Sequence, residues 1–256
     1  MSSNISDIEK IRENFPVSKF FADKHGMFRI SEDFKEVISE ISLKIRINGT
    51  EYASLLCINE LQREMACGFL FNEGVINSFD DIKNIDFNES YQTVNVDLNK
   101  NISLNVADSF RSVTSGCGKK NESTEQFRLK DIVENMKVFN DEPPIFKAYG
   151  GVHGAKYVNS DFSVLVEDIG RHNCIDKIAG IMLEKNVKRN GIMFVSGRIS
   201  SEIITKIVRM EIPVIVSRST PTVPAIKLAQ KYGVTVIGYL RGESGIIYSG
   251  RERVSV

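Results

Sequence analysis

Arginine recurs in turns that directly follow predicted strands in the second half of the chain. The four arginines are Arg171, Arg198, Arg218 and Arg241. The carboxyl ends of parallel strands meet at one edge of a sheet, where helix N-termini present free N–H groups to ligands. Because a guanidinium matches phosphate or carboxylate oxygens, the four turns together predict a polyanion site. The alternative is that each arginine pairs with a neighbouring acid, with Asn173 and Thr220 acting as ordinary helix caps.

A second chemical signal is a cysteine set between glycines and lysines in the run Thr114–Lys120. The glycines leave the Cys117 thiol accessible and the lysines favour its thiolate, which makes Cys117 a candidate nucleophile or sulfur carrier. The alternative is a loop cysteine that happens to lie near lysines. Cys174 is its rival, because the first turn of a helix also lowers a thiol pKa, although simple packing explains it too. Cys57 and Cys67 flank an amphipathic helix and are expected in the core.

Two histidines form a third signal. His153 follows a pair of glycines, and His172 lies beside Arg171. Either could orient a ligand or shuttle a proton, and a purely structural hydrogen-bonding role is the alternative for each.

The first half of the chain has the pattern of an antiparallel, β-rich unit. Ile41–Ile47 alternates apolar and polar residues, and Asn48-Gly49 is typical of a hairpin turn. Val94–Leu98 and Ile102–Val106 predict a second hairpin, and Glu60–Asn72 predicts a helix.

The middle of the chain separates two predicted units, residues 1–140 and 141–256. Residues 108–121 contain little apolar content and predict a long mobile loop. Ser123-x-x-Gln126 resembles a capping box that opens a helix running to about Phe139. The two prolines that follow mark the boundary.

The second half alternates strands with helices, which predicts an α/β domain with a largely parallel sheet. Strands are expected near Ala155–Val158, Phe162–Val166, Ile192–Val195, Val214–Val216, Val234–Tyr239 and Ile246–Tyr248. Helices are expected over Cys174–Lys185, Ser200–Met210 and Pro221–Tyr232.

Composition indicates a cytoplasmic globular protein. The chain has 256 residues and no formal net charge, but Lys188–Val256 holds eleven Lys and Arg against four Glu, a formal +7. That asymmetry favours an anionic partner, with an ordinary solvated basic face as the alternative. The polar Met1–Phe15 lacks a signal-peptide core, and no apolar run is long enough to span a bilayer. The four cysteines lack paired spacing, which is typical of reduced thiols. No membrane or nucleic-acid partner is expected.

Taken in order from about Glu40 onward, the motifs resemble the formate dehydrogenase accessory family, the FdhD-type sulfur carriers. The first are Asn48-Gly49, Gly68-Phe69-Leu70 with Glu73-Gly74, and Thr114-Ser115-Gly116-Cys117-Gly118. Gly150-Gly151-Val152-His153 and Asp168-Ile169-Gly170-Arg171-His172-Asn173 with Asp176-Lys177 follow. The last are Ser196-Gly197-Arg198, Ser219-Thr220-Pro221-Thr222 and Gly238-Tyr239-Leu240-Arg241-Gly242.

This resemblance implies a specific activity. Family members receive persulfide sulfur from a cysteine desulfurase and pass it to the molybdenum of the bis-molybdopterin guanine dinucleotide cofactor, which formate dehydrogenase requires. The persulfide cysteine falls on Cys117. The cofactor-binding stretch falls on Tyr239, Leu240, Arg241, Gly242, Glu243 and Ser244, to which we add Arg198, Arg171, His172 and Ser219. Guanosine diphosphate is the expected mimic of the cofactor.

The resemblance also implies a fold similar to the cytidine deaminases, with an added N-terminal antiparallel β-rich subdomain and a homodimeric assembly. One departure matters: many members carry Cys-x-x-Cys in the loop, whereas the second position here is Lys120. A single-cysteine relay remains sufficient. A non-catalytic chaperone that binds the cofactor and docks on formate dehydrogenase is the alternative function.

Missing motifs argue against two other enzyme classes. Zinc deaminases need His-x-Glu and Pro-Cys-x-x-Cys, but the candidate segments read His153-Gly154-Ala155 and Pro221-Thr222-Val223-Pro224-Ala225. No resident metal is therefore expected. No Gly-x-Gly-x-x-Gly follows a strand, so an NAD-dependent dehydrogenase is not supported.

Overall fold

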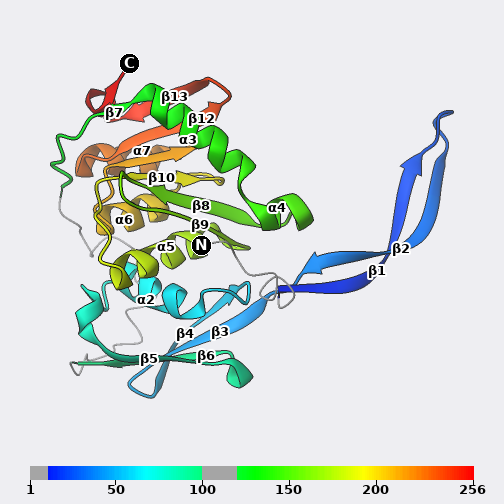
Figure 1. Cartoon of the computed structure of the whole chain (residues 1–256), viewed down its shortest axis with the longest axis horizontal. Coiled ribbons are helices and arrows are strands. Elements are labelled where there is room, and N and C mark those ends of the chain that lie inside the picture. The colour runs from blue at the N-terminus through cyan, green and yellow to red at the C-terminus, as the bar shows by residue number, and fades with distance from the viewer. Residues whose placement is uncertain (1–10, 100–119) are drawn as a thin grey trace.

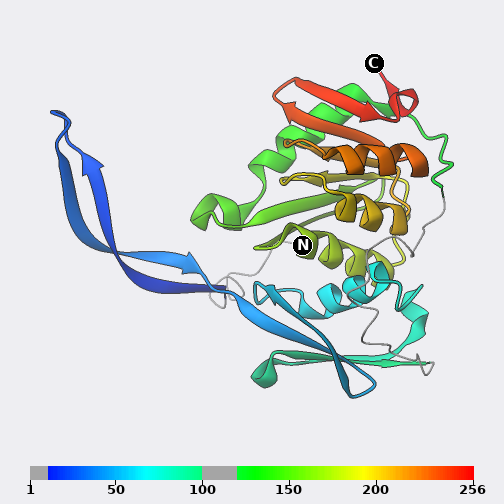
Figure 2. The ribbon, with the colours of Figure 1, turned by 180° about the vertical axis from the view of Figure 1, so that it is seen from behind.

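The computed structural model describes residues 11–99 and 120–256 (Figure 1). Its body contains a six-stranded sheet with helices on both faces and a smaller four-stranded sheet, and a two-stranded arm projects from it (Figures 1 and 2). The arm consists of β1 (Arg12–Ala22) and β2 (Phe28–Ile38). Within the described ranges, no helix is long and apolar enough to cross a membrane.

The large sheet has the strand order β13-β12-β11-β10-β8-β9. Its strands are β8 (His153–Val158), β9 (Ser163–Asp168), β10 (Ile192–Val195), β11 (Val214–Ser217), β12 (Thr235–Arg241) and β13 (Ser244–Ser249). Only the pairs β10–β11 and β11–β12 are parallel. The prediction of a largely parallel sheet was therefore wrong, and the sheet is mixed. Tight turns join β8 to β9 and β12 to β13, and so short a connection can link only antiparallel strands.

Helices cover both faces of this sheet. They are α3 (Leu129–Asp141), α4 (Pro144–Tyr149), α5 (Arg171–Glu184), α6 (Ser201–Arg209) and α7 (Val223–Tyr232). Met193 packs into the core cluster that contains the apolar residues of α5, α6 and α7. Its neighbour Phe194 points to the other face and packs with Met136 and Phe139 of α3. This alternation follows from the period of two along a strand.

The smaller sheet has the order β4-β3-β6-β5. Its strands are β3 (Ile41–Ile47), β4 (Thr50–Cys57), β5 (Ile82–Asn88) and β6 (Thr93–Leu98). The Asn48-Gly49 turn is confirmed, and both residues have positive φ values, 48° and 81°. Of the second expected hairpin, β6 is confirmed, and its expected partner at 102–106 lies outside the described residues.

Helix α2 (Gln62–Asn72) joins the two sheets by crossing α5 at a pair of glycines. A Cβ atom on Gly68 would overlap the carbonyl oxygen of Asp176, and one on Gly180 would overlap the carbonyl oxygen of Glu64. The backbones of α2 and α5 therefore touch at a distance that no other residue allows.

The segment after residue 120 differs from expectation. Ser123 does not open a helix: Phe127–Arg128 forms the short strand β7, parallel to β14 (Val254–Ser255), and α3 begins at Leu129. The reason is tertiary, because the Gln126 amide donates to the carbonyl of Glu252 at 2.9 Å instead of completing a capping box. The boundary at residues 140 and 141 stays a prediction, although α3 packs on the large sheet.

The glycine crossing makes a prediction for stability. Gly180→Ala should lower the free energy of unfolding by about 2–4 kcal/mol, because the added methyl group has to push α2 and α5 apart. Gly154→Ala is the matched control, since its Cβ would meet Phe139 at an ordinary 3.5 Å. Urea denaturation of both variants is the measurement, and equal midpoints would contradict the crossing.

Candidate functional site

The arginine-bearing turns gather at one edge of the large sheet, as expected. Strands β10 and β11 run in parallel and lead into Arg198 and Arg218, while β12 carries Arg241 at its end. Strand β8 is antiparallel to both β10 and β9, so β9 runs in the same direction as β10. It leads through Asp168 into Arg171, the first residue of α5. The order of strands thus brings four separate segments to the same edge.

Polar contacts hold three of these turns against one another. The Ser217 hydroxyl donates to the carbonyl of Gly197 at 2.8 Å and accepts from the backbone N–H of Ser219 at 2.9 Å. The backbone N–H of Tyr239 in turn donates to the carbonyl of Ser219 at 2.8 Å. The relative positions of the turns are therefore set by backbone groups and one buried hydroxyl, and not by the arginine side chains.

No carboxylate among residues 11–99 and 120–256 neutralises these arginines. Among the described residues, no Asp or Glu forms an ion pair with Arg171, Arg198, Arg218 or Arg241, whereas eight other Lys and Arg residues in the body do so. The alternative that each arginine pairs with a neighbouring acid is therefore wrong for the described acids. The edge presents positive charge that remains available to an anion.

A hollow of about 390 Å³ opens at this edge. It is lined by Asn140, Arg218, Leu240, Arg241 and Gly242. Arg218 and Asn140 also line a much smaller crevice of about 20 Å³, together with the Phe146 ring, which lies 5.5 Å from the Arg218 guanidinium. The Arg241 Nε atom donates to the carbonyl of Arg218 at 3.3 Å. The two guanidinium groups thus border one continuous depression.

Tyr239 is held in a strained conformation at the rim. Its φ of 56° lies in the left-handed region, which a bulky residue rarely adopts and which is often found at binding sites. The ring is 46% exposed, and the Arg241 guanidinium lies 4.4 Å from its centroid. This pair forms a flat surface beside the hollow.

The two histidines have different surroundings. Burial lowers the pKa of His153, and the charges of Arg171 and Arg218 lower it further. Its Nδ1 atom lies 3.4 Å from the Ser196 hydroxyl. Burial, and then the charge of Lys206, also lower the pKa of His172, but its Nε2 atom lies 3.0 Å from a carboxylate oxygen of Glu202 on α6. His153 faces two of the four arginines, Arg171 and Arg218, whereas His172 faces Arg171 and Lys206.

The structure brings together some of the predicted site residues and separates others. Leu240, Arg241 and Gly242 line the hollow with Arg218. The predicted residues that do not line it are Tyr239, Glu243, Ser244, Arg198, Arg171, His172 and Ser219. Glu243 is turned away, because its carboxylate pairs with Lys137 at 2.8 Å. Asn140, which lines the hollow, and Phe146, which lines the crevice beside it, were missed because only the packing of α3 and α4 brings them here.

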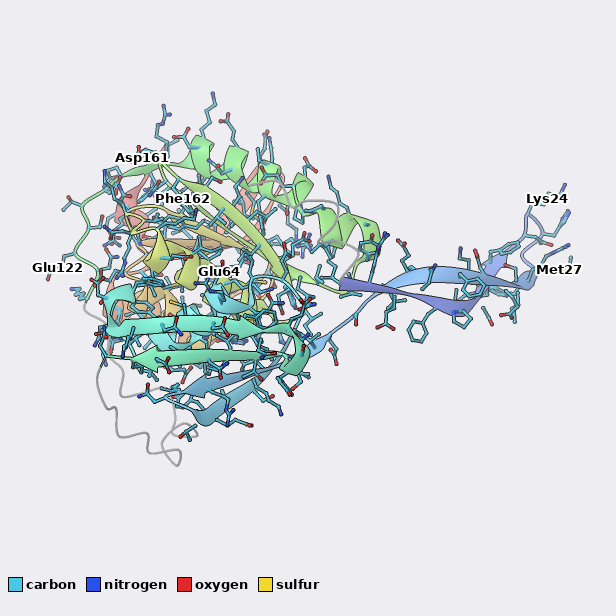
Figure 3. All side chains as sticks on the ribbon, turned by 60° about the horizontal axis from the view of Figure 1, so that its bottom comes forward. Lys24, Met27, Glu64, Glu122, Asp161 and Phe162 are labelled. Atoms are coloured by element: carbon cyan, nitrogen blue, oxygen red, sulfur yellow. The ribbon has the colours of Figure 1, made fainter. Side chains whose placement is uncertain are left out.

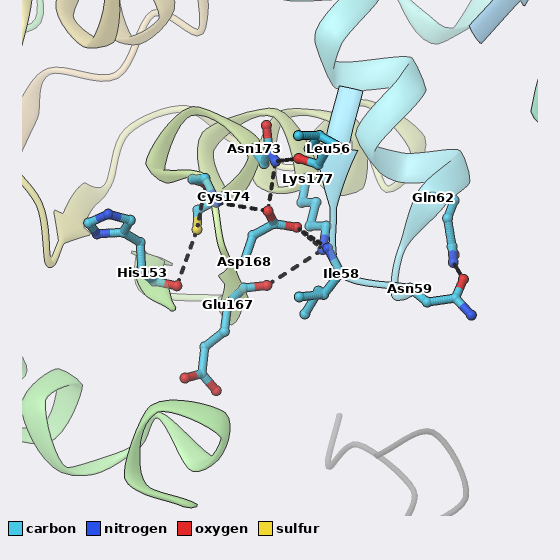
Figure 4. Close-up of polar contacts among 11 residues, drawn as sticks. Leu56, Ile58, Asn59, Gln62, His153, Glu167, Asp168, Asn173, Cys174 and Lys177 are labelled. Carbon is cyan, nitrogen blue, oxygen red and sulfur yellow. Dashed lines mark hydrogen bonds and ion pairs between the residues drawn. The ribbon is translucent and has the colours of Figure 1, made fainter. Parts of the chain in front are cut away.

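The described cysteines are not reactive. Burial raises the pKa values of Cys57 and Cys67 to about 12. Cys174 is fully buried, with its thiol 3.4 Å from the carbonyl oxygens of His153 and Gly170 (Figure 4). Burial, and then Asp168, raise its pKa, so of the two alternatives for Cys174 the structure supports simple packing and not a reactive thiol. The helix begins at Arg171 and not at Cys174. Cys117 lies outside the described residues.

A buried ion pair fixes the turn before α5. The Lys177 ammonium lies 2.7 Å from Asp168, and neither side chain is exposed to solvent. Asp168 also accepts from the backbone N–H groups of Ile58 and Gly170 at 3.3 and 3.0 Å. Asn173 donates to Asp168 and to the carbonyl of Leu56 (Figure 4). Asn173 therefore ties the turn to β4 instead of capping α5.

Known proteins are similar to this chain in sequence and in fold. Residues 38–255 match the model of the FdhD/NarQ family. The sulfur carrier protein FdhD of Staphylococcus haemolyticus is 36% identical over 85% of this chain and 89% of its own length. That of Bacillus pumilus is 32% identical over 91% of this chain and 94% of its own. A solved Desulfotalea psychrophila structure, described as a formate dehydrogenase accessory protein, has a TM-score of 0.79 over 94% of this chain and 99% of that chain, at 23% identity. The chain belongs to the FdhD/NarQ family.

Proposed function

We propose that this protein is a sulfurtransferase that takes persulfide sulfur from a cysteine desulfurase onto Cys117. It then delivers that sulfur to the molybdenum of the bis-molybdopterin guanine dinucleotide cofactor for formate dehydrogenase. The cofactor is the substrate. It is held at the edge of the large sheet that carries Arg171, Arg198, Arg218 and Arg241, here called the arginine edge. The relatives named above are sulfur carrier proteins, which supports the sulfur chemistry.

One observation carries the proposed ligand: the arginines at this edge have no acid partner among the described residues. Four guanidinium groups at one edge repel one another, and a polyanion relieves that repulsion. A diphosphate offers the bidentate oxygens that Arg218 and Arg241 can both contact at the border of the hollow. The hollow of about 390 Å³ is within the usual range of small-molecule pockets, roughly 300–1,000 Å³.

Other residues in and near the hollow suit the rest of a guanine nucleotide. The exposed Tyr239 ring offers a face on which a base can stack, and Arg241 already lies against that ring. Asn140 supplies an amide that can both donate and accept hydrogen bonds. Burial and the charges of two arginines lower the pKa of His153, so its imidazole can take up a proton when a polyanion binds.

Loading of Cys117 needs no external oxidant or reductant. The Cys117 thiolate attacks the terminal sulfur of the donor's persulfide, and a new S–S bond forms on Cys117. The S–S bond of the donor breaks, and its cysteine leaves as a thiolate. The buried Cys57, Cys67 and Cys174 cannot take this role, because burial raises the pKa of each thiol.

We further propose a cytoplasmic homodimer that meets two proteins in turn. A cysteine desulfurase supplies the sulfur, and formate dehydrogenase receives the sulfurated cofactor.

Nucleotide binding tests the arginine edge. Arg218→Gln and Arg241→Gln should each weaken guanosine diphosphate binding about 10- to 100-fold, the loss of one charge-assisted hydrogen bond of about 1.5–3 kcal/mol. Arg46→Gln, at an exposed position on β3, is the control and should bind as the wild type does. Isothermal titration calorimetry is the measurement. If the wild-type protein bound neither guanosine diphosphate nor the intact cofactor, the proposed ligand would be wrong.

The pKa of His153 gives this binding a pH dependence. A bound polyanion offsets the charges of Arg171 and Arg218 and raises the lowered pKa, so binding takes up a proton. Affinity should therefore gain a component that grows as the pH falls below about 6.5, the ordinary pKa of histidine. His153→Gln should remove that component, while the titration of the ligand itself stays common to both proteins. Calorimetry in buffers of different ionisation enthalpy counts the protons, and equal uptake by both proteins would exclude His153.

Mass spectrometry of the intact protein tests the sulfur carrier. After incubation with a cysteine desulfurase and cysteine, the wild-type protein and Cys174→Ala should gain one sulfur atom, and Cys117→Ala should not. An adduct that survived in Cys117→Ala would identify a different carrier. No adduct on any protein, with nucleotide binding intact, would favour a non-catalytic chaperone for the cofactor.

A further inference from the structure

Helix α4 begins without a cap of its own. Its N-cap residue is Pro143, which offers no side-chain hydrogen bond to the helix. The first N–H groups of a helix have no partner within it, so a buried helix start needs an acceptor from another segment. In this fold the acceptor comes from β9, which lies at one end of the strand order of the large sheet.

The acceptor is the carboxylate of Glu167, a residue that is only 4% exposed. One oxygen accepts from the backbone N–H of Ile145 at 2.9 Å, and the other accepts from that of Phe146 at 2.7 Å. The next residue of β9, Asp168, points to the opposite face of the sheet, because side chains alternate along a strand. Figure 4 shows Asp168 directed at Lys177, and Glu167 directed at the green helix, α4. Two charge-assisted hydrogen bonds to adjacent N–H groups fix the start of α4.

Keeping this carboxylate ionised costs free energy. Burial raises the pKa of Glu167, the bonds from Ile145 and Phe146 lower it only in part, and the charge of Glu60 raises it further. A raised carboxyl pKa means that the folded protein disfavours the charged form relative to the unfolded chain. The charge of Glu167 therefore does not stabilise the fold, and what Glu167 provides is the position of α4.

Helix α4 lies between the arm and the arginine edge. Its Ile145 packs in a buried cluster beside the arm, and Figures 1 and 3 show α4 at the place where the arm leaves the body. The ring of its Phe146 lies 5.5 Å from the Arg218 guanidinium and lines the crevice beside the hollow. The two N–H groups that Glu167 binds thus belong to one residue anchored in the core and one that faces the arginine edge.

The Phe146 ring is the group that holds the Arg218 guanidinium. Within residues 11–99 and 120–256, nothing forms a hydrogen bond or an ion pair with this guanidinium. A guanidinium within about 6 Å of a ring centroid is attracted to the face of the ring. Arg241 differs, because it has both the Tyr239 ring at 4.4 Å and the carbonyl of Arg218 to bind. Of these two arginines that border the hollow, Arg218 is the one whose position depends on α4.

We propose that Glu167 is a positioning residue for the ligand of the hollow. It caps α4 from β9, so Phe146 stays against Arg218 and the guanidinium is in place before an anion arrives. Glu167 does not line the hollow, and it therefore acts through α4 and not by contact with the ligand. Holding an arginine in its bound position lowers the entropy lost on binding. The inference rests on the proposed function in taking guanosine diphosphate as the ligand.

A double-mutant cycle, measured by isothermal titration calorimetry with guanosine diphosphate, tests this role. Glu167→Gln turns one acceptor oxygen into an NH2 group, so it can accept from one N–H of α4 and not from both. Its affinity should fall about 3- to 10-fold, the effect of one side chain that is no longer held in place. Phe146→Leu should cause a similar fall, because it removes the ring that attracts Arg218. The combined variant should bind as the weaker single variant does, since both changes act through the same contact. Losses that add in full, or an unchanged affinity in Glu167→Gln, would overturn the proposal.

Tyr157→Phe is the matched control for lost stability. It removes two buried hydrogen bonds, one from the Tyr157 hydroxyl to the carbonyl of Lys188 at 2.6 Å and one from the Gly191 N–H to that hydroxyl at 2.9 Å. These bonds lie at the opposite edge of the sheet, where β10 begins. Tyr157→Phe should lower the urea midpoint and leave the affinity unchanged. If its affinity fell as far as that of Glu167→Gln, general destabilisation would explain both results and the proposal would be wrong.

A second measurement needs no ligand. The chain has three histidines, so an NMR titration can follow His153, whose pKa burial and nearby arginines, Arg218 among them, hold down. Released from Phe146, Arg218 can turn into solvent, and the pKa of His153 should rise in Glu167→Gln and in Phe146→Leu. It should stay unchanged in Tyr157→Phe. Loss of the Glu167 charge by itself would lower the pKa of His153, so the direction of the change is decisive.

The two measurements separate this proposal from the proposed ligand. A His153 pKa that fell or stayed the same in Glu167→Gln would overturn the positioning role, whatever the nucleotide does. A rise, in a protein whose wild type bound no guanosine diphosphate, would refute the proposed ligand and leave the positioning of Arg218 by Glu167 supported.

Discussion

The buried ion pair between Asp168 and Lys177 is the constraint on which the rest of the structure depends. Both side chains are fully buried, so removing either partner would leave an uncompensated charge, at a cost of about 3–5 kcal/mol. Asp168 is the last residue of β9. Its carboxylate also accepts a hydrogen bond from the backbone N–H of Ile58, just beyond β4. One carboxylate thus joins the smaller sheet to the edge of the large one. It also sets where α5 begins, and so where Arg171 stands.

The turns that form the arginine edge are likewise held in place by hydrogen bonds to the backbone. Like charges close together destabilise a fold, so the turns that carry them need support that does not come from the charges themselves. Ser217 and the backbone of Ser219 supply it by binding the neighbouring turns. The strain at Tyr239 is part of the same arrangement, because the backbone N–H that bonds Ser219 belongs to the residue with the positive φ. The fold therefore holds a repulsive cluster in place before any ligand binds.

Sequence patterns predicted this edge because the signal was local: a β-rich run, then a turn with glycine or serine, then arginine. They failed where packing between distant segments decides. Asn140 reaches the hollow, and Phe146 the crevice beside it, only because α3 and α4 pack next to the edge of the sheet. Gln126 was assigned to a capping box, but its amide instead bonds Glu252 near the C-terminus. The arm escaped notice because both of its faces are exposed, so no alternation of apolar and polar residues marks its strands.

The proposed relay has to carry sulfur from the edge where the strands of the large sheet begin to the edge where they end. The described chain resumes at Lys120, and Asn121 is held by the carbonyls of Tyr232 and Glu211 and by the buried Arg253. Tyr232 and Glu211 precede β12 and β11, so this anchor lies at the edge where those strands begin, and the arginines lie where they end (Figure 1). Between Glu211 and Arg218 lies β11 (Val214–Ser217), which at ~3.3 Å per residue advances about 10 Å, and the turns at its two ends add to that separation. Cys117 precedes Asn121 by four residues, which covalent geometry limits to about 14 Å. A ligand that extends beyond its phosphates, or a cysteine presented by a second subunit, would shorten the distance that the proposed transfer has to cover.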